Sequence, residues 1–582
     1  MPAPRQFKRP VRPARRSALT GLAAVAFAPL LGGAEFGVMT HFAQGWNPTL
    51  IQAVSAAQIP TVRDELYWKS VEPQPGVYTF PARFETYMAG LAAGGVAPLI
   101  ELDFENPLYD GGLTPCTDAG RTAYANYASA VLRHYGSQIK TVEIWNEFNG
   151  SFCKGPDTQD RAGSYFALLK TAHDRIKRDR PDVIVVGGGT AGIPLPYLEK
   201  LFRLGALEHM DALSVHPYRF DRPPEGLELD LQRLNDLVRQ YNHGRTMPIW
   251  VTEIGWGTKA SVAPGDLEIT DSRQASFLVR AYALLVSAEV ERVYWYLFRD
   301  YGPFATMGLV HDDASASPKS SYAAAKVMVR LLGGCTYQGR DRTPADLYSM
   351  RFGTSDGRQL RVLWSLSGRK IAPVGATRIT DLYGKEINPA QELAVTENPV
   401  YIEGPVQGLP APAPDAPTLL ADSTADFSAQ QGGSGWSYGC VMGNTAGFIP
   451  LSTYRVTDWK REWADRHPHL SITETDQHPS VTGSEKIAAV RRWTSDRTGQ
   501  VQITARFQTG VRGDGVGVEI RAADRVLFSR TLGGGGATVA DFSTTLPVRP
   551  GTTLDFSVDP GPDHNIDFDA TVVSVRIYQA NS

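Results

Sequence analysis

Cysteine is scarce in this chain, whose 582 residues include only four: Cys116, Cys153, Cys335 and Cys440. No two of them form a CxxC pair and none has a histidine partner at the spacing of a zinc site, so we expect neither a metal nor a cofactor. In an exported protein a disulfide becomes possible. Cys116 and Cys153 fall in neighbouring predicted loops and are the candidate pair, with free thiols as an equal alternative.

An excess of one charge and long apolar runs are also missing. The 58 Lys and Arg residues nearly balance the 61 Asp and Glu residues, giving a net charge of −3, which lacks the basic footprint of a nucleic-acid-binding protein. Beyond the N-terminus no stretch approaches the ~20 apolar residues of a membrane-spanning helix, so we expect no stable membrane insertion. "GGGT" at 187–190 lacks the GxGxxG spacing of a dinucleotide site.

The first 34 residues have the order of an export signal. A basic stretch with an arginine pair at 15–16 precedes an apolar run at 18–31, and small residues follow at 32–34. Paired arginines before such a run suggest the twin-arginine route. The alternatives are a short membrane anchor or a fortuitous apolar tail, but fourteen residues are too few to span a bilayer comfortably. We predict a signal peptide over 1–34 and a periplasmic or secreted protein.

From residue 35 the chain alternates between short β-rich runs and amphipathic stretches with helical spacing. The eight β-rich runs are 35–42, 61–68, 97–104, 141–148, 183–190, 211–218, 249–256 and 292–300. The clearest helical stretches are 82–95, 123–136, 161–181 and 271–288. Strands that alternate with helices pair in parallel. Eight repeats in ~300 residues fit an α/β fold of the (β/α)₈ TIM-barrel type, which we place at 35–335.

The pattern changes after a last predicted helix at about 319–334. Short strands broken by turns predict a small β-sandwich over 336–404, and the Pro- and Ala-rich segment 405–418 has the composition of a semi-rigid linker. Alternating strands over 419–582 predict a second β-sandwich of jelly-roll size, similar in kind to carbohydrate-binding domains. Three of its tryptophans, which either bind sugar or fill the core, are Trp436, Trp459 and Trp493.

Polar and aromatic residues gather at the ends of the predicted barrel strands. The C-terminal ends of the strands form the working face of such a barrel, so these residues are candidates for the site. The set is His41, Arg63, Asn106, Asn146, Glu147, His216, Tyr218, Glu253, Trp256, Trp295 and Tyr296.

Two glutamates stand out among them. Glu147 in "TVEIWNEFNG" ends the fourth predicted strand and Glu253 in "IWVTEIGWGT" ends the seventh, so they should face each other across the barrel mouth. Glycoside hydrolysis needs such a pair, one acid to protonate the leaving oxygen and one carboxylate to attack or to activate water. Either glutamate alone could be a strand-end acid in a salt bridge.

These motifs resemble a known enzyme family. "IWNEF" followed by "VTEIGW" resembles the two signatures of the large (β/α)₈ superfamily of retaining glycosidases that carries its glutamates on strands four and seven. "FGVMTHF", "VRDELYWKSVEPQPGVYTF", "LDFENPLYD" and "SVHPY" are most similar to glycoside hydrolase family 39. Within it they resemble the periplasmic glycosidases associated with bacterial exopolysaccharide (Psl-type) clusters. The resemblance covers about residues 35–404.

The resemblance implies a role for several residues. Glu147 would be the acid/base and Glu253 the nucleophile, kept ionised by the cation of Arg63 and a hydrogen bond from Tyr218. Asn146 would bind the sugar hydroxyl next to the reacting carbon, and His216 would contact or orient the acid/base. A buried acid with a raised pKa and a nucleophile beside a cation suit these two roles physically.

Other residues have two interpretations. Arg63 could instead neutralise Asp64 or Glu65, and His41 is either a sugar ligand or a satisfied strand-end histidine. Trp256 is a subsite wall or loop packing. Trp295 and Tyr296 point to opposite faces of their strand, so only one can stack on substrate, and we predict Trp295. The acidic stretch formed by Glu101, Asp103, Glu105 and Asp110 could bind a cation, but subsite ligands, with Asn106 among them, and solvated loop charges fit its spacing better.

We therefore predict an exported retaining glycosidase that cleaves β-linkages of a bacterial exopolysaccharide, with endo action and a monomeric state. An exo-acting β-xylosidase-like enzyme is the enzymatic alternative. A non-catalytic polysaccharide-binding or assembly protein is the alternative from another class.

Overall fold

The computed structural model describes residues 33–580 apart from 221, 259–266, 268, 303–305, 345, 412–417, 444–446, 511–513, 536–537 and 563–564. Residues 1–32 of the predicted signal peptide and 412–417 of the predicted linker therefore lie outside the described residues. Both predictions stay open.

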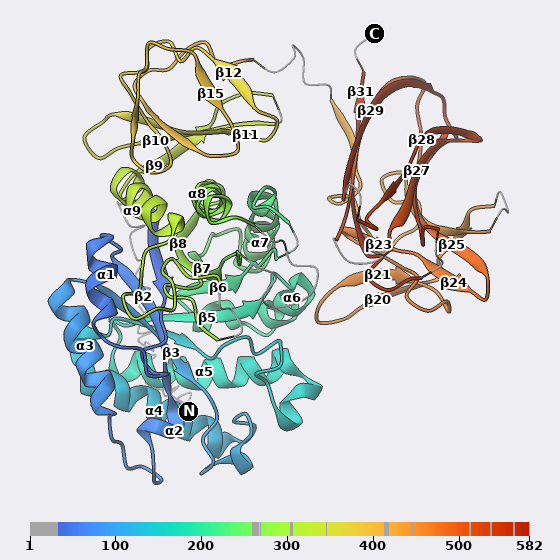
Figure 1. Cartoon of the computed structure of the whole chain (residues 1–582). Coiled ribbons are helices and arrows are strands. Elements are labelled where there is room, and N and C mark those ends of the chain that lie inside the picture. Colours follow the sequence, from blue (N-terminus) through green and yellow to red (C-terminus); the bar gives the residue numbers. More distant parts are fainter. Residues whose placement is uncertain are drawn as a thin grey trace, which may run out of the picture. The chain divides into compact units, whose positions relative to one another are not determined.

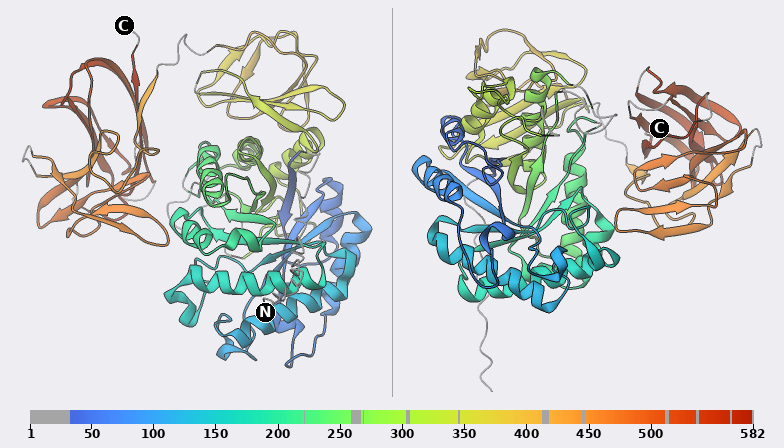
Figure 2. Two further views of the ribbon diagram at one scale, coloured as in Figure 1. Left: turned by 180° about the vertical axis from the view of Figure 1, so that it is seen from behind. Right: turned by 60° about the horizontal axis from the view of Figure 1, so that its bottom comes forward.

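A closed barrel of eight parallel strands forms the first part of the described chain, with helices around it (Figure 1). Its strands, each overlapping one predicted run, are β1 (Glu35–Met39), β2 (Thr61–Tyr67), β3 (Ala97–Asp103), β4 (Thr141–Ile144), β5 (Ile184–Ala191), β6 (Ala212–His216), β7 (Ile249–Ile254) and β8 (Val290–Trp295). The predicted (β/α)₈ fold is thus confirmed. The views of Figure 2 show the helices lying outside the strands.

The helices follow the strands in the expected order. They are α1 (Leu50–Ala56), α2 (Trp68–Val71), α3 (Ala82–Gly94), α4 (Asp118–Tyr135), α5 (Arg161–Asp179), α6 (Leu195–Arg203), α7 (Leu227–Tyr241), α8 (Asp271–Ser287) and α9 (Ser320–Leu332), with short 3₁₀ helices η1 (Asp110–Gly112), η2 (Gly136–Gln138), η3 (Gly155–Gln159) and η4 (Ala206–His209). The helix predicted at 123–136 begins five residues earlier, because the Thr117 side chain accepts a hydrogen bond from the Gly120 N–H and caps it.

Side chains inside the barrel form two layers of opposite character. The lower layer is apolar and consists of Leu99, Val186, Ala212, Trp250 and Tyr294. Side chains alternate along a strand, so the residue two positions further on returns to the interior. On β3 this places Glu101 and Asp103 above Leu99. The barrel therefore changes from hydrocarbon to ionisable groups toward its C-terminal end.

A small β-sandwich follows the barrel, as predicted. Its strands are β9 (Thr336–Arg340), β10 (Leu347–Gly353), β11 (Gln359–Ser365), β12 (Arg369–Ile371), β13 (Arg378–Thr380), β14 (Glu386–Ile387), β15 (Leu393–Val395) and β16 (Val400–Glu403). Six form an antiparallel sheet in the order β14-β13-β16-β11-β10-β9, and β12 pairs with β15. Trp364 of this sandwich is buried and its indole N–H donates to Glu225 Oε1 at 3.0 Å.

The C-terminal part is a second all-β unit. Its strands are β17 (Leu419–Asp422), β18 (Trp436–Met442), β19 (Ile449–Pro450), β20 (Thr453–Val456), β21 (Arg461–Ala464), β22 (Ser471–Thr473), β23 (Asp476–His478), β24 (Ser480–Thr482), β25 (Glu485–Thr494), β26 (Gly499–Thr509), β27 (Val516–Ala522), β28 (Arg525–Leu532), β29 (Val539–Val548), β30 (Thr553–Asp559) and β31 (Thr571–Gln579). They form sheets of eight and seven strands around one apolar core. Trp436 and Trp493 pair across β18 and β25 inside that core, whereas Trp459 is exposed.

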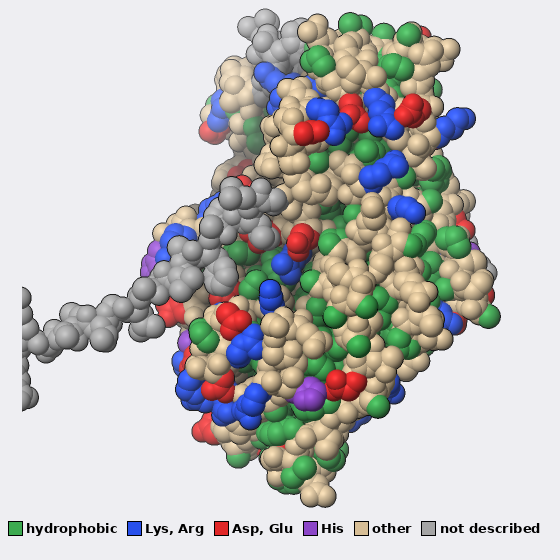
Figure 3. Space-filling view, turned by 90° about the vertical axis from the view of Figure 1, so that its left-hand side faces the viewer, with side chains coloured by type: hydrophobic (Ala, Val, Ile, Leu, Met, Phe, Trp, Pro, Cys, Tyr) green, Lys and Arg blue, Asp and Glu red, His purple; other side chains and the backbone are tan. Residues whose placement is uncertain are grey.

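The distribution of surface charge and the free state of the cysteines agree with a protein that is stabilised by its apolar cores. On the face drawn in Figure 3, Lys and Arg side chains are interspersed with Asp and Glu side chains.

All four cysteines are free thiols, so the Cys116–Cys153 pairing is not formed. Cys153 is buried and Cys116 is only partly so, and two neighbouring loops do not by themselves bring two Cβ atoms within the ~4 Å that a disulfide needs. Within the described residues no helix is both long and apolar enough to cross a bilayer.

Asp569 gives the C-terminal unit a predictable pH dependence. Its side chain is buried, and burial together with the carboxyls of Asp514, Asp559 and Asp567 raises its pKa to about 7. The folded protein holds this proton more tightly than the unfolded chain does, so stability that is present below about pH 4 is lost as the pH rises toward 7. Relative to wild type, Asp569→Asn should gain roughly 2–4 kcal/mol at pH 8 and little at pH 4. Denaturant titrations at both pH values measure this, and an equal effect at both would contradict it.

Candidate active site

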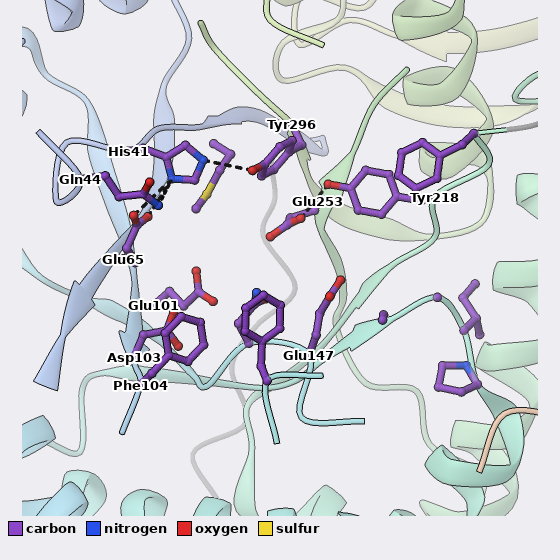
Figure 4. Close-up of a pocket in the computed structure, with 18 of the residues that line it drawn as sticks. His41, Gln44, Glu65, Glu101, Asp103, Phe104, Glu147, Tyr218, Glu253 and Tyr296 are labelled. Atoms are coloured by element: carbon purple, nitrogen blue, oxygen red, sulfur yellow. Dashed lines mark hydrogen bonds and ion pairs between the residues drawn. The ribbon is translucent and has the colours of Figure 1, made fainter. Parts of the chain in front are cut away.

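A pocket of about 620 Å³ opens at the C-terminal ends of the barrel strands (Figure 4). This volume lies within the usual range for small-molecule sites. Glu147 and Glu253 both line it, as do Asn146, Tyr218 and His41. The strand-end residues from β1, β4, β6 and β7 thus meet in one cavity.

The backbone after β4 delivers Glu147 to this cavity. Strand β4 ends at Ile144, and Trp145 and Glu147 then take positive φ values of 66° and 43°. Left-handed backbone costs a side-chain-bearing residue about 1–2 kcal/mol, so the surroundings must hold it. The Glu147 N–H donates to the Gly189 carbonyl at 2.7 Å.

The "GGGT" segment of β5 serves this packing. A Cβ on Gly188, whose φ is 104°, would lie 2.5 Å from the Ser214 carbonyl oxygen, so only glycine fits there. The Gly189 N–H donates to the Ser214 hydroxyl at 2.8 Å. The glycines therefore allow β5, β6 and the Glu147 backbone to approach closely.

Glu147 and Glu253 lie close enough to act on one bond. One oxygen from each carboxylate and one ring nitrogen of His216 all lie within 4.8 Å of one another. Retaining glycosidases hold their two carboxyl groups ~5–5.5 Å apart, whereas inverting enzymes hold them ~6.5–9.5 Å apart to admit a water. Carboxylate oxygens this close favour the retaining geometry over the wider inverting one.

A cation and a hydroxyl group hold the two oxygens of Glu253. Arg63 donates from Nη1 to Oε1 at 2.7 Å, and the Tyr218 hydroxyl donates to Oε2 at 2.6 Å. A cation and a hydroxyl donor on the two oxygens stabilise the carboxylate and fix its orientation. These are the two contacts that the family resemblance implies.

Glu147 lies beside a histidine that carries a proton. His216 Nδ1 is 2.9 Å from Glu147 Oε1, and its Nε2 is 3.0 Å from the Thr252 hydroxyl. That hydroxyl donates its single proton to Glu143 at 2.9 Å, so Nε2 must donate to it. Burial disfavours the charged imidazole, but Glu253 and Glu147 outweigh it and raise the pKa of His216. His216 therefore donates from Nε2 to Thr252 and faces Glu147 with Nδ1.

Arg63 lies beneath the pocket and pairs with several buried carboxylates. Its side chain is fully buried and reaches Glu253, Glu143 at 2.6 Å and Glu101 at 3.0 Å. Burial lowers the pKa of Arg63, but these three carboxylates raise it well above its usual value. Nη2 also donates to Asn146 Oδ1 at 3.3 Å. The network thus connects β4, through Glu143, and β7, through Glu253, to one cation.

His41 and a cluster of stacked aromatic rings complete the walls. His41 lies 3.1 Å from both Glu65 Oε2 and the Tyr296 hydroxyl, so it has protein partners on both ring nitrogens. Phe104 stacks between Tyr67 at 6.1 Å and Phe152 at 5.1 Å, measured between ring centroids. Flat aromatic rings lining a polar pocket suit the apolar faces of sugars.

Three predicted ligands lie elsewhere in the described structure. Trp295 is buried outside the barrel interior, where its indole N–H donates to the Met307 carbonyl at 3.0 Å. Tyr294 and Tyr296 alternate with it and point inward, so Tyr296 lines the pocket instead. Trp256 is buried and donates to the Arg219 carbonyl at 2.6 Å, which decides for loop packing.

Asn106 is also a structural residue. It is buried, its amide donates to the Glu72 carbonyl at 2.9 Å, and its Oδ1 accepts from the Leu108 N–H at 3.0 Å. It therefore holds the loop after β3 rather than lining the pocket. Of the acidic stretch, Glu101 and Asp103 line the pocket, while Glu105 pairs with Lys154 at 2.5 Å and Asp110 accepts from Thr117 at 2.6 Å.

Several pocket residues were not predicted. Glu65 and Tyr67 line the pocket on the same strand face as Arg63, two and four positions further on. This alternation along the strand was the sequence signal that could have identified them. Phe152, Pro194 and Phe220 come from loops, where no periodicity points to them. A partly exposed cluster of His173, Asp174 and His209 also has ligand atoms within 4.8 Å of one another, although Lys170 pairs with Asp174 at 3.0 Å.

Comparison with known proteins gives a likeness in fold. No family model and no curated protein matches the sequence. A family 39 glycoside hydrolase from the gut symbiont Bacteroides cellulosilyticus WH2 is 23% identical with a TM-score of 0.55, over 64% of this chain and 81% of that chain. A conserved exported protein from Bacteroides fragilis is 10% identical with a TM-score of 0.51, over 64% of this chain and 97% of that one. At these identities the likeness shows the fold alone.

Proposed function

We propose that the chain is a retaining glycoside hydrolase in which Glu147 is the acid/base and Glu253 the nucleophile. The observation that carries the proposal is the pair of carboxylates within 4.8 Å, one held by Arg63 and Tyr218 and the other by His216. Two carboxylates whose surroundings differ in this way are suited to opposite roles. The fold of a family 39 enzyme from another organism is consistent with it.

The first chemical step uses both glutamates. Glu253 Oε attacks the anomeric carbon while the bond from that carbon to the leaving oxygen breaks, and Glu147 donates its proton to that oxygen. A glycosyl ester on Glu253 results. Arg63 remains paired with Glu143 and Glu101 beneath the site. The Tyr218 hydroxyl remains beside the Glu253 oxygen that it contacts, while the ester removes the negative charge of that carboxylate.

The second step returns the enzyme to its starting state. Glu147, now a carboxylate, takes a proton from a water that attacks the same carbon, and the ester bond to Glu253 breaks. His216 next to Glu147 supplies an adjacent proton store, because its Nδ1 lies 2.9 Å from the carboxylate. Asn146, positioned by Arg63, lies where a neighbouring sugar hydroxyl would bind.

For the substrate we propose a β-linked bacterial exopolysaccharide cleaved internally by an exported, monomeric enzyme. The supports are the N-terminal export pattern and the motif resemblance to exopolysaccharide-associated glycosidases. Incubation with a panel of native exopolysaccharides, followed by size analysis of the products, tests this. A ladder of oligosaccharides is expected, whereas release of monosaccharides alone would assign the exo-acting alternative.

A non-catalytic polysaccharide-binding protein is the remaining alternative. Sugar binding alone would explain the aromatic walls of the pocket. It would not explain the paired carboxylates, since a binding protein needs no acid and nucleophile placed to act on one bond. Binding of an exopolysaccharide without any product, under conditions where the protein is folded, would favour it.

Glu147→Gln should separate the two chemical steps. Without the acid, kcat/KM on alkyl or sugar leaving groups should fall by roughly 10²–10⁴-fold. Dinitrophenyl glycosides of the same sugar need no protonation of the leaving oxygen, so their first step should be far less affected. Parallel kinetics on the two substrate types measure this. Equal losses on both would contradict the acid/base assignment.

A further inference from the structure

One end of the pocket carries more carboxyl groups than the chemistry uses. Five carboxyl groups line the pocket and, among the described lining residues, no Lys or Arg does. Glu147 and Glu253 are taken by catalysis. The other three, Glu65, Glu101 and Asp103, come from β2 and β3 and lie together on one side of the pocket (Figure 4).

Strand register brings these three acids side by side. Glu65 on β2 is the direct partner of Glu101 on β3, and Tyr67 is the partner of Asp103. Cβ atoms of directly paired residues lie within about 5.5 Å of each other. All three acids are at least 98% buried. They therefore form one carboxyl cluster rather than three separate solvated charges.

The protein satisfies only part of this cluster. Glu65 accepts from the Tyr67 hydroxyl at 3.1 Å and lies 3.1 Å from His41. Glu101 has the shared cation of Arg63 at 3.0 Å. Asp103 Oδ1 is buried and has no hydrogen-bond partner among the described residues, although its carboxyl interacts with that of Glu101. Burial, with a smaller effect of the Glu101 carboxyl, raises the pKa of Asp103 well above its usual value. Burial also raises the pKa of Glu101 to about 8 although Arg63 opposes it, so a cation bound beside these acids would stabilise their ionised forms.

Such a cluster selects among sugars by charge. An uncompensated buried acceptor costs ~1–3 kcal/mol unless a ligand supplies a donor. A hydroxyl supplies one donor and no charge, whereas an ammonium group supplies three donors and a positive charge. A uronate, sulfate or phosphate would be repelled. The faces of Tyr67 and Phe104 beside the cluster suit the ring that carries the cation.

We propose that the Glu65–Glu101–Asp103 end of the pocket is a subsite for an amino sugar whose amine is free rather than acylated. The inference rests on the proposed glycosidase function and names its substrate class: a polysaccharide with cationic hexosamine units. An N-acetyl group would remove the charge and two of the donors.

Monosaccharide binding tests the subsite without requiring hydrolysis. Glucosamine, galactosamine and mannosamine would each be titrated into wild-type protein at pH 7.5, where a pKa of about 8 leaves Glu101 partly ionised, beside the parent hexose and the N-acetyl form, by calorimetry. In at least one series the free amine should bind about tenfold or more tightly than both neutral forms. No amine preference in any series would overturn the proposal.

Variants locate the effect. Asp103→Asn and Glu101→Gln, combined, should reduce the amine preference to about twofold or less, and Glu65→Gln should reduce it independently. Glu105→Gln, a loop acid paired with Lys154, is the matched control and should keep the full preference. A preference that survives in both acid variants would place the amine elsewhere and contradict the assignment.

The two proposals fail separately. Monosaccharides contain no glycosidic bond, so an absent amine preference leaves the glycosidase proposal standing. An intact preference in a protein that hydrolyses nothing would overturn the catalytic proposal and leave the subsite.

Discussion

Glu253→Ala is expected to lower kcat by roughly 10⁴-fold or more, because no other group in the pocket is placed to form the covalent intermediate. Arg63 and Tyr218 would remain, but both are donors and cannot attack carbon. Steady-state hydrolysis of an activated aryl glycoside measures the loss. Added azide or formate should restore turnover by occupying the space of the missing carboxylate, and with azide the product should be the glycosyl azide of inverted configuration.

Two observations would contradict the nucleophile assignment. Undiminished hydrolysis by Glu253→Ala is the first, and a product with azide in the retained configuration is the second. Glu289→Ala is the matched control, because this glutamate is exposed and pairs with Arg239 at 3.2 Å away from the pocket. It should hydrolyse at the wild-type rate.

The second large effect is expected for Arg63→Met, which should destabilise the fold by about 3–5 kcal/mol and also abolish most activity. Removing the guanidinium leaves Glu143, Glu253 and Glu101 buried without their shared cation. Their mutual repulsion then opposes folding, and Glu253 loses the guanidinium that holds Oε1 in place. Denaturant unfolding and kcat, measured on the same preparation, test both parts.

Arg63→Lys separates charge from geometry. Lysine supplies the charge but not the fork that reaches Glu143 from Nε and Glu253 from Nη1. We expect it to recover part of the lost stability and little of the activity. Wild-type stability in Arg63→Met would show that the network is not what holds these carboxylates.

The barrel and the proposed catalytic pair were accessible from sequence because both depend on local patterns. Eight β-rich runs alternate with helical stretches, and parallel strands then place all their C-terminal ends at one face. Glu147 and Glu253 follow directly from that rule. Their contacts with Arg63, Tyr218 and His216 were expected from the family resemblance and are present in the structure.

The site residues that were predicted wrongly or not at all depend on the direction in which individual side chains point. Trp295 and Tyr296 are adjacent, and only the inward position of Tyr294 decides between them. Asn106 looks like a ligand until its bond to the Glu72 carbonyl is seen. Glu65 and Tyr67 were missed although they follow Arg63 on the same strand face with a period of two, which was a signal that could have found them.

The central claim is that Glu147 and Glu253 cleave a β-glycosidic bond with retention, and the anomeric configuration of the first product tests it most directly. Proton NMR followed from the first minutes of hydrolysis distinguishes the two anomers before mutarotation mixes them. The account predicts that the β anomer appears first and the α anomer only later. Initial formation of the α anomer would show inversion and contradict it.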